Sequence, residues 1–189
     1  SIVCVECLSV FHETFEVGAG EAFGCRDERI DRDCTECRGQ LREMFKRLRE
    51  FQGGKVGVIV GVPHKCPIAP VEVTFSLHDY FKARGIRDKV EMKYHYPINR
   101  IHTIEQVAKW AKPEFDRLGI EYETLFNVKE VDVKNRIVKS EEGTEFAYDL
   151  LIAIPPHRGM EVIEKSKLGQ GGWIPTDRYK LTMEGHGNV

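Results

Sequence analysis

The sequence predicts an α/β fold, in which a parallel β-sheet has flanking helices and carries an inserted antiparallel β-meander. A near-continuous apolar run at residues 55–62 (KVGVIVGV) has the composition of a parallel strand that is buried on both faces. Helix and strand patterns then alternate as far as residue 126, and right-handed crossovers turn such an order into a parallel sheet. Short alternating segments and a closing apolar strand follow. These features together describe a Rossmann-like domain with an insertion.

A helix is expected before the first strand. Asp33 is a suitable N-cap, and Glu36 follows three residues later in a capping-box arrangement. Apolar residues then recur at helical spacing, at Leu41, Met44, Phe45, Leu48 and Phe51. Gly53-Gly54 ends this pattern, so the helix leads directly into the strand at residues 55–62.

Further strand–helix units complete the parallel part of the sheet. The expected elements are a helix at about residues 69–84, a strand at 89–96, a helix at 104–118 bent at Pro113, and a strand at 120–126. The meander is expected at residues 127–133, 136–140 and 145–148, because turn signals separate these segments. An apolar strand at residues 149–154 then stops at Pro155-Pro156, and the tail from Gly171 onward is rich in turn residues.

Composition excludes several classes of function. The 189 residues suit one domain with a small appendage, and the net charge of −2 argues against a nucleic-acid footprint. No apolar run approaches the roughly 20 residues of a transmembrane helix, and no signal peptide is visible. We therefore expect a cytoplasmic protein, or one held peripherally at the cytoplasmic membrane by other segments of a longer parent.

The turn after the first strand departs from a dinucleotide-binding site. Such a site needs G-x-G-x-x-G, because glycines let the backbone approach a pyrophosphate. Here the turn reads Gly61-Val62-Pro63-His64-Lys65-Cys66-Pro67, in which one glycine remains and the prolines carry no N–H. The second strand also ends in His95-Tyr96-Pro97, without the acidic residue that binds an NAD ribose. The sequence therefore predicts that NAD(P) is not bound.

Cysteines concentrate at the start of the chain. Five of the six lie in the first 37 residues, and no secretory feature accompanies them, so metal or redox chemistry is favoured over structural disulfides. Residues 1–32 form an irregular cysteine-rich segment, and residues 33–189 form the central domain. Cys34 and Cys37 fall in the first turn of the expected helix, where backbone N–H groups and the helix dipole favour a thiolate.

The order of the elements and the sequence motifs within them resemble those of the FAD-dependent pyridine nucleotide-disulfide oxidoreductase superfamily. More narrowly, they resemble its sulfide:quinone oxidoreductase branch. The resemblance covers about Asp33 to Val189 and is carried by GGKVGVIVGVPHKCPIAPVE, YFKARGIRDKVEM, WAKPEFDRLGIE, EEGTEFAYDLLIAIPPHRG and GGWIPTDRYKLTMEGHGNV. It implies the central, NAD(P)-binding-like domain of a larger flavoprotein. FAD would be bound by the full-length protein, and electrons would pass from sulfide through redox cysteines and flavin to quinone.

The resemblance also implies site residues and partners. Cys34 falls where these enzymes carry a redox cysteine. Gly61, Pro155 and Pro156 lie at the edge that would face the flavin-bearing half, so they are candidate cofactor-binding residues. The expected partners are the missing flavin-binding segments, sulfide and a quinone, with membrane contact only through absent segments. The fragment alone is expected to be inactive.

Two other functions remain open. The C-x2-C pairs Cys4/Cys7 and Cys34/Cys37 could supply four thiolates to a zinc ion in a non-catalytic interaction module. Cys25 could replace one ligand, and an iron–sulfur cluster is a further possibility. Alternatively, the chain could belong to an NAD(P)H-dependent flavoprotein with an unusual nucleotide turn.

Several other residues carry simpler expectations. Cys66 is expected to be a small core hydrophobe between strand and helix. His64 and Lys65 could meet an anion at the next helix N-terminus, although Glu72 opposes one. We expect solvent or interface positions for the histidines His95, His102 and His157. We expect core or domain-contact positions for the tryptophans Trp110 and Trp173.

Overall fold

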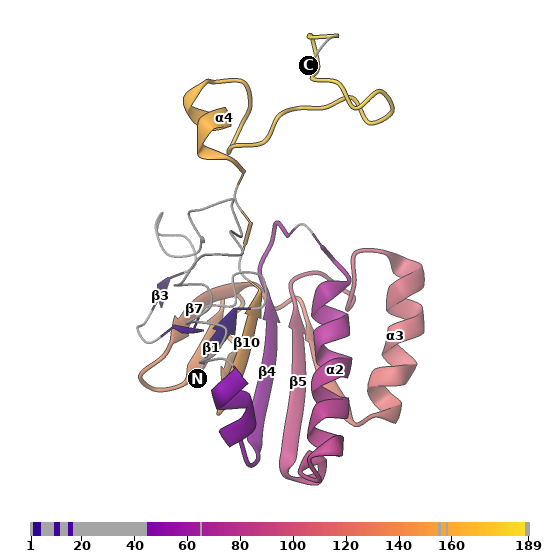
Figure 1. Cartoon of the computed structure of the whole chain (residues 1–189), viewed down its shortest axis with the longest axis vertical. Coiled ribbons are helices and arrows are strands. Elements are labelled where there is room, and N and C mark those ends of the chain that lie inside the picture. Colours follow the sequence, from indigo (N-terminus) through magenta and orange to yellow (C-terminus); the bar gives the residue numbers. More distant parts are fainter. Residues whose placement is uncertain are drawn as a thin grey trace. The chain divides into compact units, whose positions relative to one another are not determined.

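The computed structural model describes residues 2–4, 10–11, 15–16, 45–64, 66–154, 156–157 and 159–187. The chain divides into two units, Ser1–Pro156 and His157–Val189. The first unit holds a sheet with the strand order β2-β1-β10-β4-β5-β6 (Figure 1). Its strands are β1 (Ile2–Cys4), β2 (Val10–Phe11), β4 (Gly54–Val60), β5 (Val90–Tyr96), β6 (Ile120–Thr124) and β10 (Leu150–Ile154). All neighbours are parallel except β1 and β2, so the predicted parallel sheet is confirmed.

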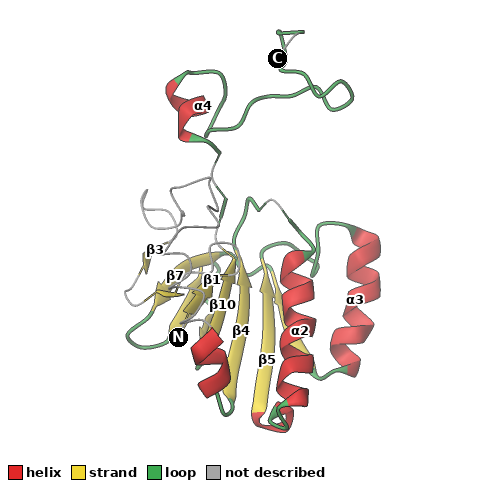
Figure 2. Cartoon of the chain, in the orientation of Figure 1, coloured by secondary structure: helices red, strands yellow, loops and turns green. Residues whose placement is uncertain are grey.

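Helices α2 (Ala69–Ala83) and α3 (Glu105–Arg117) lie along one face of this sheet (Figure 2). The alternation of side chains along β4 and β5 explains why. Val58, Tyr94 and their alternate neighbours point into a core that also contains Phe81 of α2 and Phe115 of α3. A short 3-10 turn, η1 (Arg87–Lys89), connects α2 to β5.

The predicted meander is a second, antiparallel sheet with the order β3-β7-β8-β9. Its strands are β3 (Phe15–Glu16), β7 (Val128–Asp132), β8 (Ile137–Ser140) and β9 (Glu145–Ala147). It covers the other face of β4 and β10, because Ile59 and Leu151 share a core with Val131, Val138 and Phe146. The Rossmann-like architecture with an inserted meander is therefore confirmed.

Predicted boundaries agree with the structure to within about two residues. The strand predicted at residues 55–62 ends at Val60, and that predicted at residues 120–126 ends at Thr124. Residues 45–50 are helical, as expected, whereas the start proposed at Asp33 lies outside the described residues.

The apolar start of the chain (SIVCVECLSVF) is strand-like in sequence, and β1 and β2 lie within it, whereas their bounds and β3 were not predicted. β1 pairs in parallel with β10, and β3 pairs antiparallel with β7. Strands of two or three residues carry too little periodicity to be recognised, and pairing with distant segments decides them. The domain boundary proposed between residues 32 and 33 stays a prediction.

The second unit contains one short helix, α4 (Glu161–Lys165), and turns. Isolated bridges join Gln170 to Trp173 and Thr176 to Met183. Gly159 and Gly172 are in backbone contact, and a Cβ atom on either would collide with the other. Among the described residues of the whole chain, no helix has the length and apolarity needed to cross a membrane.

Candidate functional site

The turn at the carboxyl end of β4 is the place where a Rossmann-like fold binds its dinucleotide. The Gly61 N–H donates to the carbonyl oxygen of Ile154 at 2.7 Å. A Cβ atom at Gly61 would lie 2.5 Å from Cδ of Pro156, so the proline ring occupies the space beside the glycine. Two of the predicted cofactor-binding residues are thus in contact, and Pro155 lies outside the described residues.

The N-terminus of α2 offers few donors to a phosphate. Pro70 has no N–H, and the N–H groups of Val71 and Glu72 both donate to the Ile68 carbonyl oxygen at 3.0 Å. Glu72 also places a carboxylate in the first turn, where it opposes an anion. The first turn of α2 therefore offers a pyrophosphate little stabilisation.

Cys66 is exposed and carries a free thiol. The expectation of a small core residue was therefore wrong. β4 ends at Val60 and α2 begins at Ala69, so Cys66 sits in a loop beyond the region where strand and helix pack. The thiol faces solvent at the carboxyl end of a buried parallel strand.

His64 of this turn is hydrogen bonded to Tyr96, the last residue of β5. Its Nε2 lies 2.8 Å from the Tyr96 hydroxyl oxygen, and the two rings meet edge to face. Burial raises the pKa of Tyr96, while hydrogen bonds from Thr103 to its oxygen oppose that rise. Burial and the nearby His102 lower the pKa of His64, so the imidazole is neutral at neutral pH.

His102 is 1% exposed, which corrects the expectation of a solvent or interface histidine. The loop after β5 turns back over the strand ends, because the Tyr94 hydroxyl donates to the Ile101 carbonyl at 3.2 Å. The His102 Nδ1 accepts the Ile104 N–H at 2.9 Å. Arg100 donates to the carbonyl oxygens of His102 and Thr103 at 3.0 and 2.8 Å, so the loop is held by its own polar groups.

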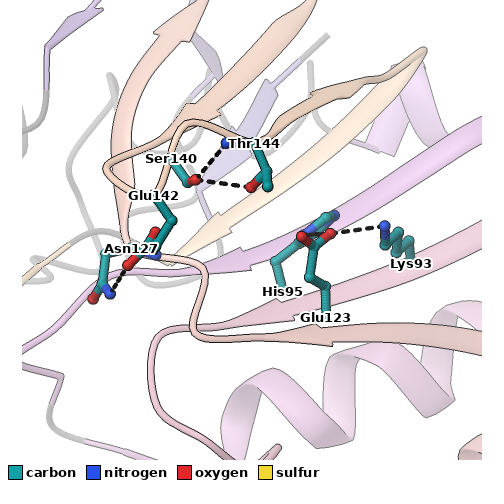
Figure 3. A network of polar contacts seen from close by, with 7 residues as sticks. All are labelled: Lys93, His95, Glu123, Asn127, Ser140, Glu142 and Thr144. Atoms are coloured by element: carbon teal, nitrogen blue, oxygen red, sulfur yellow. Dashed lines mark hydrogen bonds and ion pairs between the residues drawn. The ribbon is translucent and has the colours of Figure 1, made fainter.

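The expectation of a solvent or interface position was also wrong for His95, which is 0% exposed. Its ring lies against Phe126 and Phe146, with centroids 4.4 and 4.6 Å away. Figure 3 shows it beside Glu123, whose Oε2 lies 3.5 Å from His95 Nδ1 and 2.8 Å from the Nζ of Lys93. Burial, and secondarily Lys93, lowers the pKa of His95 to about 3. The sequence could not reveal that the meander would cover this face of β5.

The tryptophans are not core residues. Trp110 is 59% exposed and packs edge to face on Phe75, and Trp173 is 44% exposed. Core positions are therefore wrong for both, while the alternative of domain-contact positions stays a prediction. His157 is half-buried at the start of the second unit.

The predicted cysteine sites lie largely outside the described residues. This applies to Cys7, Cys34 and Cys37, as well as to Cys25 and Lys65, while Cys4 is described only as part of strand β1. Within the described ranges, no group of three His, Cys, Asp or Glu residues could hold a metal ion. Zinc therefore gains no support, and the redox role of Cys34 stays a prediction.

No family model matches the chain. The mitochondrial sulfide:quinone oxidoreductase of Dictyostelium discoideum is 26% identical over 159 residues, which cover 77% of this chain and 34% of that protein. The chain resembles the central domain of the sulfide:quinone oxidoreductases. It spans about a third of the length of this curated relative.

Solved structures share the fold. The sulfide:quinone oxidoreductase of Aquifex aeolicus matches 69% of this chain with 32% of its own, at a TM-score of 0.54 and 21% identity. A chain in the mitochondrial ATP synthase of Tetrahymena thermophila matches 77% of this chain with 37% of its own, at a TM-score of 0.56 and 16% identity. At these identities the likeness concerns the fold alone.

Proposed function

We propose that this chain is the central domain of an FAD-dependent oxidoreductase that passes electrons from sulfide, through redox cysteines and flavin, to a quinone. The observation that carries this proposal is the turn after β4. Where a dinucleotide-binding domain needs a glycine-rich turn, this chain has Gly61 closed by Pro156 and an exposed thiol at Cys66. The sequence similarity to a sulfide:quinone oxidoreductase supports the same assignment.

NAD(P)H is an unsuitable electron donor for this domain. The end of β5, where an acidic residue would bind the ribose, carries Tyr96, which is buried and hydrogen bonded to His64. The first turn of α2 provides a carboxylate at Glu72. Electrons would therefore enter through thiol chemistry.

Two cysteines are candidates for that chemistry. Cys34 is proposed from the resemblance, and we add Cys66 because its thiol is exposed at the ligand-binding edge of the sheet. Hydrosulfide would attack one sulfur of a disulfide that contains one of these residues. A persulfide forms on the attacked sulfur as the S–S bond breaks, and the second sulfur leaves as a thiolate. The S–S bond thus accepts the electron pair that the sulfide loses.

The remaining parts of the proposal concern the parent protein. FAD would be held by flavin-binding segments beyond this chain, with Gly61, Pro155 and Pro156 at the edge that faces it. Any membrane contact would also come from such segments, and the location would be the cytoplasm or the inner face of the cytoplasmic membrane. We expect this domain alone to be inactive toward quinone.

The test is persulfide formation on the chain itself. The protein is oxidised, treated with sodium hydrosulfide, and mapped by mass spectrometry with the single variants Cys66→Ser and Cys34→Ser. A gain of one sulfur atom at Cys66 or Cys34, lost in the matching variant, supports the proposal. Sulfur incorporated equally at all cysteines, or at none, would contradict it.

The NAD(P)H-dependent alternative makes an opposite prediction. Saturable NADH binding, measured by quenching of intrinsic fluorescence, would favour it over the sulfide-dependent enzyme. Stoichiometric zinc in elemental analysis would instead favour the interaction module built on the C-x2-C pairs.

A further inference from the structure

A hydrogen bond joins the turn after β4 to the last residue of β5. Nε2 of His64 lies 2.8 Å from the Tyr96 hydroxyl oxygen, and the two rings meet edge to face with centroids 5.8 Å apart. β4 and β5 are parallel neighbours, so the turn and the end of β5 lie at the same, carboxyl edge of the sheet. The bond therefore fixes one point of the turn to the sheet.

Tyr96 is a rigid support for this turn. Its side chain is 0% exposed, and its ring stacks on that of Tyr94 with centroids 5.8 Å apart. The Tyr94 hydroxyl in turn donates to the Ile101 carbonyl oxygen at 3.2 Å. The Tyr96 carbonyl oxygen accepts the N–H of Phe126 at 3.1 Å. Both the ring and the backbone of Tyr96 are thus held by their neighbours.

His64 is the inward-facing side chain in the middle of the turn. Val62, Pro63 and Cys66 are exposed, whereas His64 is half-buried. A half-buried and hydrogen-bonded imidazole among exposed side chains can hold the backbone of the turn in place. The exposed residues on either side of it have no such attachment through their side chains to β5.

Cys66 lies between two fixed points of the chain. His64 is two residues before it, and Ile68, which packs against the core, is two residues after it. The Ile68 carbonyl oxygen also accepts the N–H groups of Val71 and Glu72 at 3.0 Å, at the start of α2. Residues two apart have Cα atoms at most about 7 Å apart, so Cys66 can move little while both points hold.

Loss of the bond to Tyr96 would double the free length of the turn. The fixed point before Cys66 would then be Gly61, whose N–H donates to the Ile154 carbonyl oxygen at 2.7 Å. The unattached span would grow from residues 65–67 to residues 62–67. A longer span samples more backbone conformations, so the position of the Cys66 thiol would be less well defined.

We propose that His64 and Tyr96 are positioning residues for Cys66, whose thiol their hydrogen bond holds in place for sulfur chemistry. The inference rests on the proposed function, in which Cys66 forms a disulfide that hydrosulfide then attacks. A disulfide within the protein requires two sulfur atoms to meet, so its formation depends on the effective concentration of Cys66 at its partner sulfur. Neither positioning residue needs to touch the reacting sulfur atoms.

The first measurement is the mobility of the turn in the intact ¹⁵N-labelled chain. Order parameters of the backbone amides of Val62, His64 and Cys66 should be near the value of about 0.85 that rigid backbone shows. In Tyr96→Phe, which keeps the buried ring and removes the hydroxyl, we expect them to fall toward about 0.6. Equal order parameters in Tyr96→Phe and the native chain would overturn the proposal.

The second measurement is the effective concentration of Cys66, obtained by equilibrating the chain with a glutathione redox buffer and mapping its disulfides by mass spectrometry. Two thiols of the chain give up two electrons and two protons, and one glutathione disulfide becomes two glutathione thiols. We expect the effective concentration to fall about fivefold in Tyr96→Phe, which corresponds to one hydrogen bond.

Alkylation of Cys66 by iodoacetamide separates position from reactivity, because it needs no partner sulfur. Its rate in Tyr96→Phe should stay within about twofold of the native rate. An unchanged effective concentration, or an alkylation rate that falls as far as the effective concentration, would contradict a positioning role.

Matched variants make the result specific. His64→Ala removes the other partner at a half-buried position, so it should reproduce Tyr96→Phe, and the double variant should be no worse than either. His64→Gln keeps a side-chain hydrogen-bonding group and should stay within about twofold of the native chain. Tyr148→Phe is the control, because the Tyr148 hydroxyl is buried with no hydrogen-bond partner among the described residues. Circular dichroism checks folding, and equal losses in Tyr148→Phe and Tyr96→Phe would refute the role of the bond.

The outcomes distinguish this inference from the proposed function. If the native chain forms neither a disulfide nor a persulfide at Cys66, the sulfur chemistry proposed for this thiol fails, and the positioning role fails with it. If Cys66 forms a persulfide equally fast in the native chain and in Tyr96→Phe, the proposed function stands and only the positioning role is overturned.

Discussion

The Nδ1 atom of His95 lies 3.5 Å from Oε2 of Glu123, which is also paired with Lys93 (Figure 3). The histidine is buried beneath the meander, and its nitrogens have no hydrogen-bond partner among the described residues. The Glu123 carboxylate thus forms an ion pair with Lys93, while the neutral imidazole of His95 lies beside it. This arrangement makes the first unit sensitive to acid.

The first prediction concerns stability and pH. The pKa of His95 is about 3 in the folded chain and near 6.5 when unfolded, so the unfolded state binds more protons between these values. Stability is therefore fully present above pH 6.5 and falls as the pH decreases toward 3. Between pH 7 and 4.5 the loss from His95 should be about 2–3 kcal/mol. Urea denaturation at the two pH values measures it.

The control for this prediction is a pair of variants. His95→Phe fills a similar volume and cannot be protonated, so its unfolding free energy should depend less on pH. His186→Gln changes an exposed histidine and should keep the native dependence. An identical acid-induced loss in His95→Phe and the native chain would contradict the role assigned to His95.

A second prediction concerns Gly57 in β4. A Cβ atom there would collide with the Phe146 ring and lie 3.0 Å from Cδ1 of Leu151. Gly57→Ala should therefore lower the free energy of unfolding by about 1–3 kcal/mol, because it overpacks the core beneath the meander. Thermal unfolding measures the change. Gly187→Ala has no atom within 4 Å of its new Cβ and should be neutral; similar losses in both would contradict the packing argument.

A third prediction tests the contact between Gly61 and Pro156. Gly61→Ala should destabilise the chain by about 1–3 kcal/mol, because the new methyl group meets the proline ring. Pro156→Ala removes part of that ring and should recover some of the lost stability in the double variant. Denaturant unfolding of both single variants and the double variant gives the coupling energy. Strictly additive losses would show that the two residues do not interact.

A fourth prediction concerns Arg87 at the amino end of β5. Its guanidinium donates to His78 Nδ1 at 2.9 Å and to the carbonyl oxygens of Val90, Leu118 and Gly119 at 2.7, 2.8 and 2.8 Å. Lysine cannot reproduce this fork, so Arg87→Lys should cost about 1–3 kcal/mol of unfolding free energy. Chemical denaturation measures it. Arg178→Lys, at an exposed position, is the matched control, and equal effects would contradict the role of the fork.

The parallel sheet was predictable because its signal is local. The apolar run of β4 and the helical spacing before Gly85 and Gly119 depend on nearest neighbours in sequence, and the structure confirms each of these elements. The residues from Gly61 to Pro67 also showed that the glycine-rich turn is lost. The contact between Gly61 and Pro156 could not be predicted, because the two residues are far apart along the chain.

The sequence by itself determined the α/β class, the order of the elements and the resemblance to the sulfide:quinone oxidoreductases. Only the tertiary structure decided that His95 and His102 are buried while Cys66 and Trp110 are exposed. The physical reason is that burial depends on what packs against a residue from elsewhere in the chain. The meander covers one face of β5, a returning loop covers its end, and neither contact is encoded in the local pattern around these residues.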